Sequence, residues 1–254
     1  MSSWIIAKNR QRKKVTVITK YHDTSLSRDV FSMYLDYISA YIYSEKLGET
    51  CNVWDSNGLI KESLKLTPQV KLLREKPEID ALSLDEYKTM TSKLTFKEIQ
   101  KIAGNLIIYD ESLNRSVVKV LDKVGIKTIF DIGIQLITGA DVVLLNRFSA
   151  LIKAFQVKSK KEKLNIYVMA DSYDTVINFQ KLCDPSWKIT SLSKNPPRDS
   201  TENFIQVLAE VQIMTALPAL ILDFNRPVDR FIYLMQRNAK MDYFVEISSK
   251  EWKL

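Results

Sequence analysis

Cysteine and histidine are scarce in this sequence of 254 residues, and their scarcity excludes several classes of site. Cys51 and Cys183 are the only cysteines, and they lie far apart without a Cys-x-x-Cys pair, which argues against a disulfide framework and a zinc site. Such cysteine usage fits a reducing compartment. His22 is the single histidine, so a metal site built from several histidines is excluded.

Long apolar runs are missing as well. No stretch of about 18 consecutive apolar residues occurs, so we expect no membrane span. Residues 4–7 form a brief apolar run ahead of a basic cluster, which is the wrong order for a secretory signal peptide. We therefore expect a soluble, cytoplasmic protein.

The charge of the chain is moderately basic. Lys and Arg number 37 against 30 Asp and Glu, which gives a formal net charge of +7. Two basic runs, residues 8–14 and residues 153–163, could meet a phosphate, a nucleic acid or another acidic surface, or could form an ordinary solvated face. Because no known nucleic-acid-reading motif is present, nucleic acid is the least favoured of these partners.

The hydrophobic pattern predicts an α/β fold with two Rossmann-like halves, residues 1–126 and residues 127–254. In the first half, strands over residues 15–19 and 51–54 flank a long helix and are followed by a helical insertion. In the second half, strands and helices alternate strictly, which predicts a mostly parallel sheet covered by helices. The expected strands cover residues 128–137, 164–170, 187–192, 219–224 and 242–247. No GxGxxG follows any of them and no P-loop occurs, so a different phosphate-binding arrangement is required.

Residues 218–238 are the stretch most typical of a ligand-binding edge. A buried strand passes through a polar turn, Asn225 and Arg226, directly into an apolar helix with Pro227 in its first turn. Such a helix directs free backbone N–H groups at the crevice beside the strand, which favours a phosphate. Arg226 lies at the turn itself, whereas Arg230 could bind the phosphate or pair with an aspartate of the same turn.

Three segments of the second half resemble the fucosyltransferase superfamily, which comprises α-1,6-fucosyltransferases, nodulation fucosyltransferases and protein O-fucosyltransferases. They are FDIGIQLITGAD (residues 130–141), LNIYVMADSYDTV (164–176) and the stretch from residue 204 to 235 that ends in DFNRPVDRFIYLM. The resemblance lies in their order and spacing relative to the family's GxHxRxGD, VxxATDD-like and FSSNVGRL-like motifs. It implies a GT-B fold, a GDP-sugar donor and a glycan acceptor, without a metal or another cofactor. Proteins of this kind are similar to glycosyltransferase-like proteins carried by large DNA viruses.

The resemblance also implies site residues, and several of them depart from the family pattern. Asp171 and Asp174 match acids that contact the base or ribose, although either could simply cap a helix. Gln135 and Ile137 stand where the family has its His and Arg, and an isoleucine cannot neutralise a diphosphate. The family's glycine-rich GxGNQ loop becomes LSRDV at residues 26–30, with both glycines lost.

Two hypotheses follow from these departures. The first is a non-catalytic binding or structural protein on a fucosyltransferase-like scaffold, whose basic surface faces a protein partner or a virion component. The second is an active glycosyltransferase that uses a GDP-sugar donor, with Arg226, Arg230 and a helix N-terminus replacing the lost arginine. We favour the first because the loss of the His, the Arg and the glycines is hard to reconcile with ordinary donor geometry.

Overall fold

The chain forms two compact units, Met1–Arg115 and Ser116–Trp252, which we describe separately. The predicted boundary after residue 126 lies close to this division and stays a prediction. The computed structural model describes residues 4–9, 14–19, 26–46, 48, 51–54, 59–73, 80–82, 94–123, 129–194, 200–237, 241 and 243–248. His22 lies outside these residues, and so do the side chains of residues 26–29.

The first unit contains a five-stranded mixed sheet in the order β4-β3-β2-β1-β5. Strands β2, β3 and β4 run parallel, and the predicted strand–helix–strand unit is present, with α1 between β2 and β3. Strand β1 runs antiparallel to both β2 and β5, which the sequence pattern did not predict. The strands are β1 Trp4–Asn9, β2 Lys14–Thr19, β3 Cys51–Trp54, β4 Val70–Leu73 and β5 Asp80–Leu82.

Helix α1, Leu26–Lys46, forms the core of the first unit. Tyr34 and Tyr37 are fully buried along it, as their helical spacing predicts, and Phe31 packs edge-to-face on Tyr34. The LSRDV segment forms the first turn of this helix. The other helices described in this unit are α2 Leu59–Ser63, α4 Phe96–Leu106 and the beginning of α5 Glu111–Lys123.

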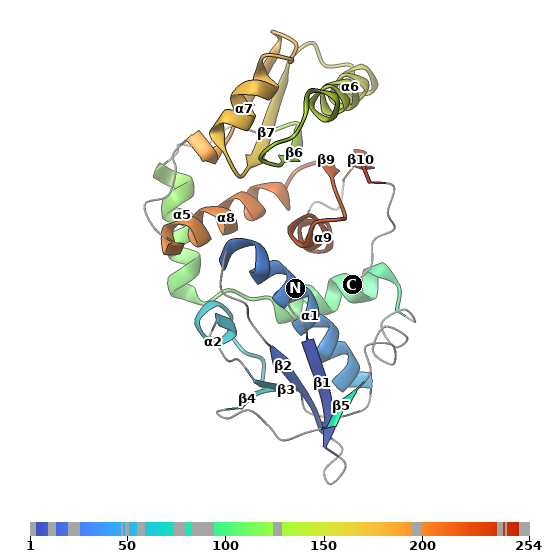
Figure 1. The fold of residues 1–254 in the computed structure, drawn as a ribbon, viewed down its shortest axis with the longest axis vertical. Helices are drawn as coiled ribbons and strands as arrows, with labels where there is room; N and C mark the ends of the chain where they lie inside the picture. Colours follow the sequence, from blue (N-terminus) through green and yellow to red (C-terminus); the bar gives the residue numbers. More distant parts are fainter. Residues whose placement is uncertain are drawn as a thin grey trace. The chain divides into compact units, whose positions relative to one another are not determined.

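The second unit is a doubly wound fold, as predicted. Its five strands are all parallel, in the order β10-β9-β6-β7-β8. Helices α6 and α7 cover one face of the sheet, and α8 and α9 lie on the other (Figure 1). The strands are β6 Ile132–Leu136, β7 Leu164–Ala170, β8 Trp187–Thr190, β9 Ala219–Leu222 and β10 Tyr243–Glu246. The helices are α6 Val142–Ser159, α7 Tyr173–Gln180, the 3-10 turn η1 Leu192–Lys194, α8 Ser200–Met214 and α9 Pro227–Leu234.

A glycine in β6 lets α8 approach the sheet closely. A Cβ on Gly133 would lie 2.5 Å from the side chain of Leu217 and 2.6 Å from that of Met214, closer than carbon atoms tolerate. The strand therefore turns a bare backbone toward the residues that end α8. This close packing fixes the position of the α8–β9 segment, which leads into the candidate site.

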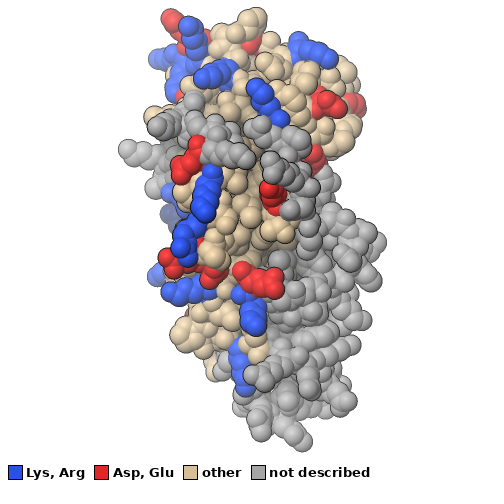
Figure 2. All heavy atoms as spheres, turned by 90° about the vertical axis from the view of Figure 1, so that its left-hand side faces the viewer, with Lys and Arg blue, Asp and Glu red and all other residues tan. Residues whose placement is uncertain are grey.

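Two expectations from the sequence concern the charge of the surface and the absence of a membrane span. On the face drawn in Figure 2, basic and acidic side chains lie interspersed, without a single field of one sign. Among the described residues, no helix combines the length and the apolar character that crossing a bilayer requires.

Candidate functional site

The carboxyl ends of the parallel strands bring together three of the predicted site residues. Gln135 lies in β6, Asp171 directly follows β7, and Arg226 follows β9 at the start of α9. The Arg226 guanidinium lies 3.7 Å from the Asp171 carboxylate, which joins the turns after two different strands. All three residues lie at the edge of the parallel sheet where ligands bind in other proteins of this architecture.

Arg226 is directed into the protein rather than toward solvent. Its side chain is 14% exposed. In the amide orientation that satisfies both partners, Gln135 Oε1 accepts hydrogen bonds from both terminal nitrogens of Arg226, at 3.2 Å each, and Gln135 Nε2 donates to Asp229. Gln135 is itself 4% exposed, so this contact is shielded from water. The guanidinium is therefore already engaged by the protein's own oxygens.

Asp229 is the central carboxylate of this cluster, and the sequence interpretation did not include it. It lies in the first turn of α9, is fully buried, and accepts a hydrogen bond from the Asp223 N–H at 2.7 Å. Burial raises the pKa of Asp229 to about 7, against the opposing attraction of Arg226. Burial likewise lowers the pKa of Arg226, against the attraction of Asp229 and Asp223. One signal could have revealed Asp229, because an acid within the apolar stripe of a helix requires a buried partner.

The backbone donors of the β9–α9 turn are also occupied by carboxylates of the protein. Besides the Asp223 N–H, the Phe224 N–H donates to Glu246 Oε1 at 3.0 Å, and the Asn225 N–H donates to Asp223 Oδ1 at 2.9 Å. The backbone N–H of Ser248 donates to the same Glu246 oxygen at 2.9 Å. Three successive N–H groups, of the kind that cradle a phosphate in other proteins, thus bind carboxylate oxygens here.

The helices that begin at this edge differ in how they are capped. Asp141 caps α6 by accepting from the Leu144 N–H at 2.8 Å, and Ser172 caps α7 by accepting from the Asp174 N–H at 3.2 Å. Helix α9 begins at Arg226 without a side-chain cap hydrogen bond. Of the three helix starts whose caps are described here, only that of α9 lacks a side chain bound to its first N–H groups.

Three predicted site residues lie apart from the contacts among Gln135, Asp171 and Arg226. Asp174 lies in the first turn of α7 with its side chain exposed, and Arg230 lies within the first turn of α9. Asn225 is exposed at the turn, where its backbone N–H is bound to Asp223. The predicted set therefore divides into three residues that converge and three that do not.

Among the described residues of this edge, acidic groups outnumber basic ones. The ends of β6, β7, β9 and β10, with the turns and first helical turns that follow, contribute two guanidiniums, those of Arg226 and Arg230, and the 3-10 turn after β8 adds Lys194. The same segments contribute the carboxyl groups of Asp141, Asp171, Asp174, Asp223, Asp229 and Glu246. Such a balance disfavours a diphosphate, which carries negative charge of its own.

Solved structures of similar architecture include those of fucosyltransferases. The crystal structure of NodZ α-1,6-fucosyltransferase soaked with GDP-fucose has a TM-score of 0.58 and 12% sequence identity, and the match covers 88% of this chain and 93% of that one. The chain has a fucosyltransferase fold. Fucosyltransferase NodZ from Bradyrhizobium matches with a TM-score of 0.55 and 11% identity, over 88% of this chain and 94% of that one. A mutant of Arabidopsis thaliana FUT1 in complex with GDP matches with a TM-score of 0.56 and 10% identity, over 86% and 67% of the two chains.

The fucosyltransferase fold agrees with the resemblance noted from the three sequence segments, and with the predicted GT-B architecture. Neither a protein-family model nor a curated protein matches the sequence. At 10 to 12% identity, the structural likeness establishes the fold and carries no activity by itself. Function must therefore be argued from the residues at the carboxyl edge.

Proposed function

We propose that this protein is a non-catalytic member of the fucosyltransferase-fold proteins, acting as a binding or structural component. The observation that carries the proposal is the occupied state of the Arg226 side chain and of the β9–α9 turn. Carboxylates of the protein take the places where a sugar nucleotide's phosphates would need a cation and backbone donors. The partner in this proposal is another protein or a virion component, and the place of action is the cytoplasm or a virion.

The energetic argument rests on what a diphosphate would have to displace. Arg226 would have to leave Gln135 and Asp171, the groups that its guanidinium contacts. The buried carboxyl group of Asp229 would also lose the nearby positive charge, and breaking a buried charge pair costs on the order of 3 to 5 kcal/mol. The diphosphate would also meet the exposed carboxylate of Asp171. Ile137, which stands where the resemblance places the family's arginine, offers no compensating charge.

One observation supports an alternative, an active glycosyltransferase with a GDP-sugar donor and a glycan acceptor. Helix α9 starts without a side-chain cap, beside the guanidinium of Arg226. If Arg226 exchanged Asp171 for a phosphate, this helix start would provide the accompanying backbone N–H groups. Structural neighbours crystallised with GDP and with GDP-fucose make this donor the one to test.

The deciding experiment is titration calorimetry of the full chain with GDP, GDP-fucose and inorganic pyrophosphate. We expect no heat of binding at millimolar concentration and no thermal shift, since a ligand at 100 times its dissociation constant would stabilise the protein by about 2.7 kcal/mol. UDP serves as the control for weak, unspecific binding. Saturable binding of GDP in the submillimolar range, without binding of UDP, would overturn the proposal.

Two variants locate any binding that is found. Arg226→Lys keeps the charge but loses the paired donors to Gln135, and a donor site at this edge would lose about tenfold in GDP affinity. Arg147→Lys changes an exposed arginine of α6 in the same way and serves as the matched control. An equal response of both variants would place the binding elsewhere.

A further inference from the structure

The opposite edge of the same sheet is rich in lysine. The last turns of α6, the end of α7 and the starts of β6, β7 and β8 contribute the side chains of Lys153, Lys158, Lys160, Lys161, Lys163, Lys181 and Lys188. Acidic groups in these segments are Asp131, Glu162 and Asp184. We call this set the amino-edge lysine surface. It contains the basic run at residues 153–163, which the carboxyl-edge site does not use.

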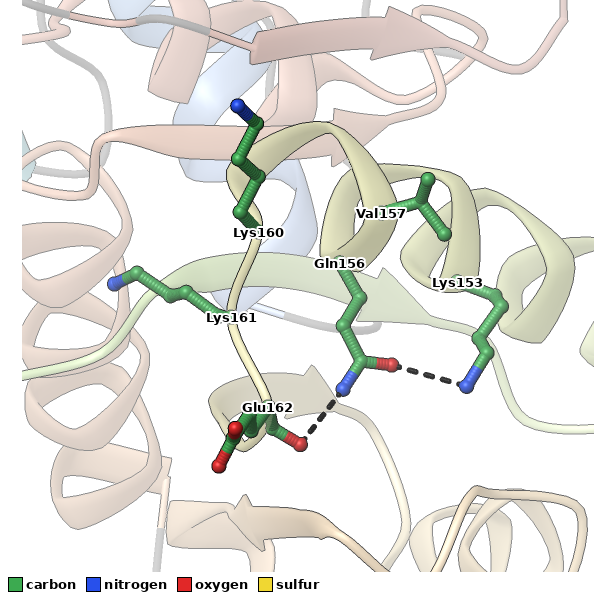
Figure 3. A pocket seen from close by; sticks show the side chains of 6 residues that line it. All are labelled: Lys153, Gln156, Val157, Lys160, Lys161 and Glu162. Atoms are coloured by element: carbon green, nitrogen blue, oxygen red, sulfur yellow. Dashed lines mark hydrogen bonds between the residues drawn. The ribbon is translucent and has the colours of Figure 1, made fainter.

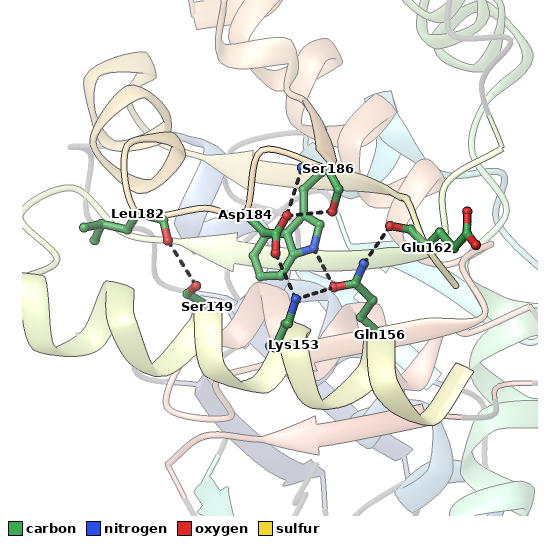
Figure 4. A network of polar contacts seen from close by, with 8 residues as sticks. Ser149, Lys153, Gln156, Glu162, Leu182, Asp184 and Ser186 are labelled. Carbon is green, nitrogen blue, oxygen red and sulfur yellow. Dashed lines mark hydrogen bonds and ion pairs between the residues drawn. The ribbon is translucent and has the colours of Figure 1, made fainter. Parts of the chain in front are cut away.

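A network centred on Gln156 holds this surface in a fixed shape. Gln156 is 7% exposed, and its side chain accepts from Trp187 Nε1 at 3.1 Å and from Lys153 Nζ at 3.2 Å (Figure 4). Its amide nitrogen donates to the Glu162 backbone oxygen at 3.1 Å, which fastens the loop after α6. Lys153 also pairs with Asp184 at 2.8 Å. The hydrogen bond from Lys153 and those from Ser186 hold the pKa of Asp184 well below its usual range, so this carboxyl group stays ionised.

A lysine occupies the one position of this loop where glycine is usual. Lys160 ends α6 in the left-handed region, with φ of 55°, and its N–H donates to the Gln156 and Val157 backbone oxygens. Glycine adopts this conformation without steric cost, whereas a side chain makes it less favourable. The loop nevertheless has Lys160 at this position, and the ammonium group of Lys160 is exposed at the tip of the loop.

The lysines line a shallow cavity but do not converge. The cavity measures about 340 Å³ and is lined by Lys153, Gln156, Val157, Lys160, Lys161 and Glu162. Figure 3 shows the side chains of Lys160 and Lys161 extending in different directions from the loop. Val157, on α6, is 71% exposed and offers an apolar contact. Lys153 and Lys161 pair with Asp184 and Asp131, yet their side chains remain 55% and 49% exposed.

We infer that the amino-edge lysine surface is a docking site for an acidic segment of a partner protein. Divergent ammonium groups suit an extended ligand with several carboxylates, because a single small anion needs donors that point at one spot. No aromatic ring lines the described cavity for base stacking, which favours an acidic peptide over a single-stranded nucleic acid. An acidic segment with an apolar residue would use both the lysines and Val157.

This inference goes beyond the proposed function, since it concerns the opposite edge of the sheet and stands whether or not GDP binds. It supplies the kind of partner that a non-catalytic scaffold requires. Binding through spread, partly exposed lysines is expected to be weak, fast and sensitive to salt. These properties set the conditions of the test.

The test measures fluorescence polarisation of a labelled synthetic peptide of glutamate, aspartate and leucine with the full chain. At about 50 mM salt we expect saturable binding, which weakens several-fold at about 300 mM. The double variant Lys160→Glu with Lys163→Glu should lose about tenfold in affinity, because each exposed ion pair contributes modestly. Lys119→Glu, an exposed charge reversal on α5, is the matched control and should change affinity little.

Other outcomes overturn the inference. Undetectable peptide binding at low salt does so, as does equal binding by the double variant and by the Lys119→Glu control. Tighter binding of a single-stranded oligonucleotide, lost in the same double variant, would instead identify a nucleic-acid surface.

A glutamine version of the double variant, which removes charge without reversing it, should give an intermediate loss of peptide affinity and controls for misfolding of the glutamate variant. GDP titration of the double variant should match that of the unmodified protein, which separates this test from the one at the carboxyl edge.

Discussion

Replacing Glu210 by glutamine should change how the stability of the protein depends on pH. Glu210 lies on α8, is 3% exposed, and accepts a hydrogen bond from the hydroxyl of the fully buried Tyr167 at 3.2 Å. Burial raises the pKa of Glu210 from 4.5 to about 8, although the Tyr167 hydrogen bond opposes the shift. Glutamine keeps an oxygen that can accept the same hydrogen bond, and it cannot ionise.

The direction in which stability changes with pH follows from the number of protons bound by the folded and the unfolded protein. Between pH 4.5 and about 8, the Glu210 carboxyl is protonated in the folded protein and ionised in the unfolded chain. Its contribution to stability is therefore complete below pH 4.5 and is lost as the pH rises through about 8. At 1.36 kcal/mol per pKa unit, the full loss is on the order of 5 kcal/mol. The glutamine variant should escape this loss.

Urea unfolding monitored by tryptophan fluorescence across this pH range tests the reasoning. The free energy of unfolding of Glu210→Gln, relative to the unmodified protein, should increase by several kcal/mol from acid to alkaline pH. The raised pKa of Asp229 has the same sign but remains in both proteins, so it cancels in the difference. Glu202→Gln, an exposed change on the same helix, is the control. A Glu210→Gln difference that stays constant within about 0.5 kcal/mol would refute the argument.

Three further predictions concern packing and capping. Gly133→Ala should destabilise the second unit by about 1 to 3 kcal/mol, because its Cβ would overlap Leu217 and Met214, and calorimetry would show a lowered Tm. Asp229→Ala should cost on the order of 2 to 5 kcal/mol in urea unfolding by leaving the Asp223 N–H and the Gln135 amide without their buried acceptor, and an unchanged midpoint would contradict the cluster. Thr95→Ala removes the side chain that accepts the Glu98 N–H at 3.3 Å in the capping box of α4, and should lower stability by about 1 kcal/mol without altering the folded circular dichroism spectrum.

The second unit could be predicted from the sequence nearly element by element, and the first could not. Short apolar runs alternating with periodic helices indicate β/α units directly, and the predicted strand at residues 164–170 coincides with β7. The pattern gave no sign of the antiparallel pairing of β1 with β2, because residues 8–14 read as a basic run rather than as parts of two strands. Antiparallel pairing of such short strands depends on their neighbours in the sheet more than on their own composition.

The location of the candidate site could be predicted from the sequence, but whether its groups are free to bind a ligand could not. Asp171 and Arg226 each follow an apolar strand, and the carboxyl ends of parallel strands share one edge, so their convergence follows from local patterns. Whether Arg226 faces a ligand or the interior depends on Asp229 and Glu246, which act through contacts between α9, β9 and β10. Contacts between charged groups of different helices and strands do not produce a periodic pattern in the sequence.

The strand order of the second unit bears on how this part of the chain folds during synthesis. Strand β6 is made first yet lies in the middle of the sheet, between β7 and β9. As the nascent chain lengthens, β7 and β8 can pair on one side of β6, while its other edge stays open until β9 emerges. An open apolar edge invites pairing with other chains. Ribosome stalling between β8 and β9 should therefore leave a chain that depends on chaperones, and release of β9 should end that dependence.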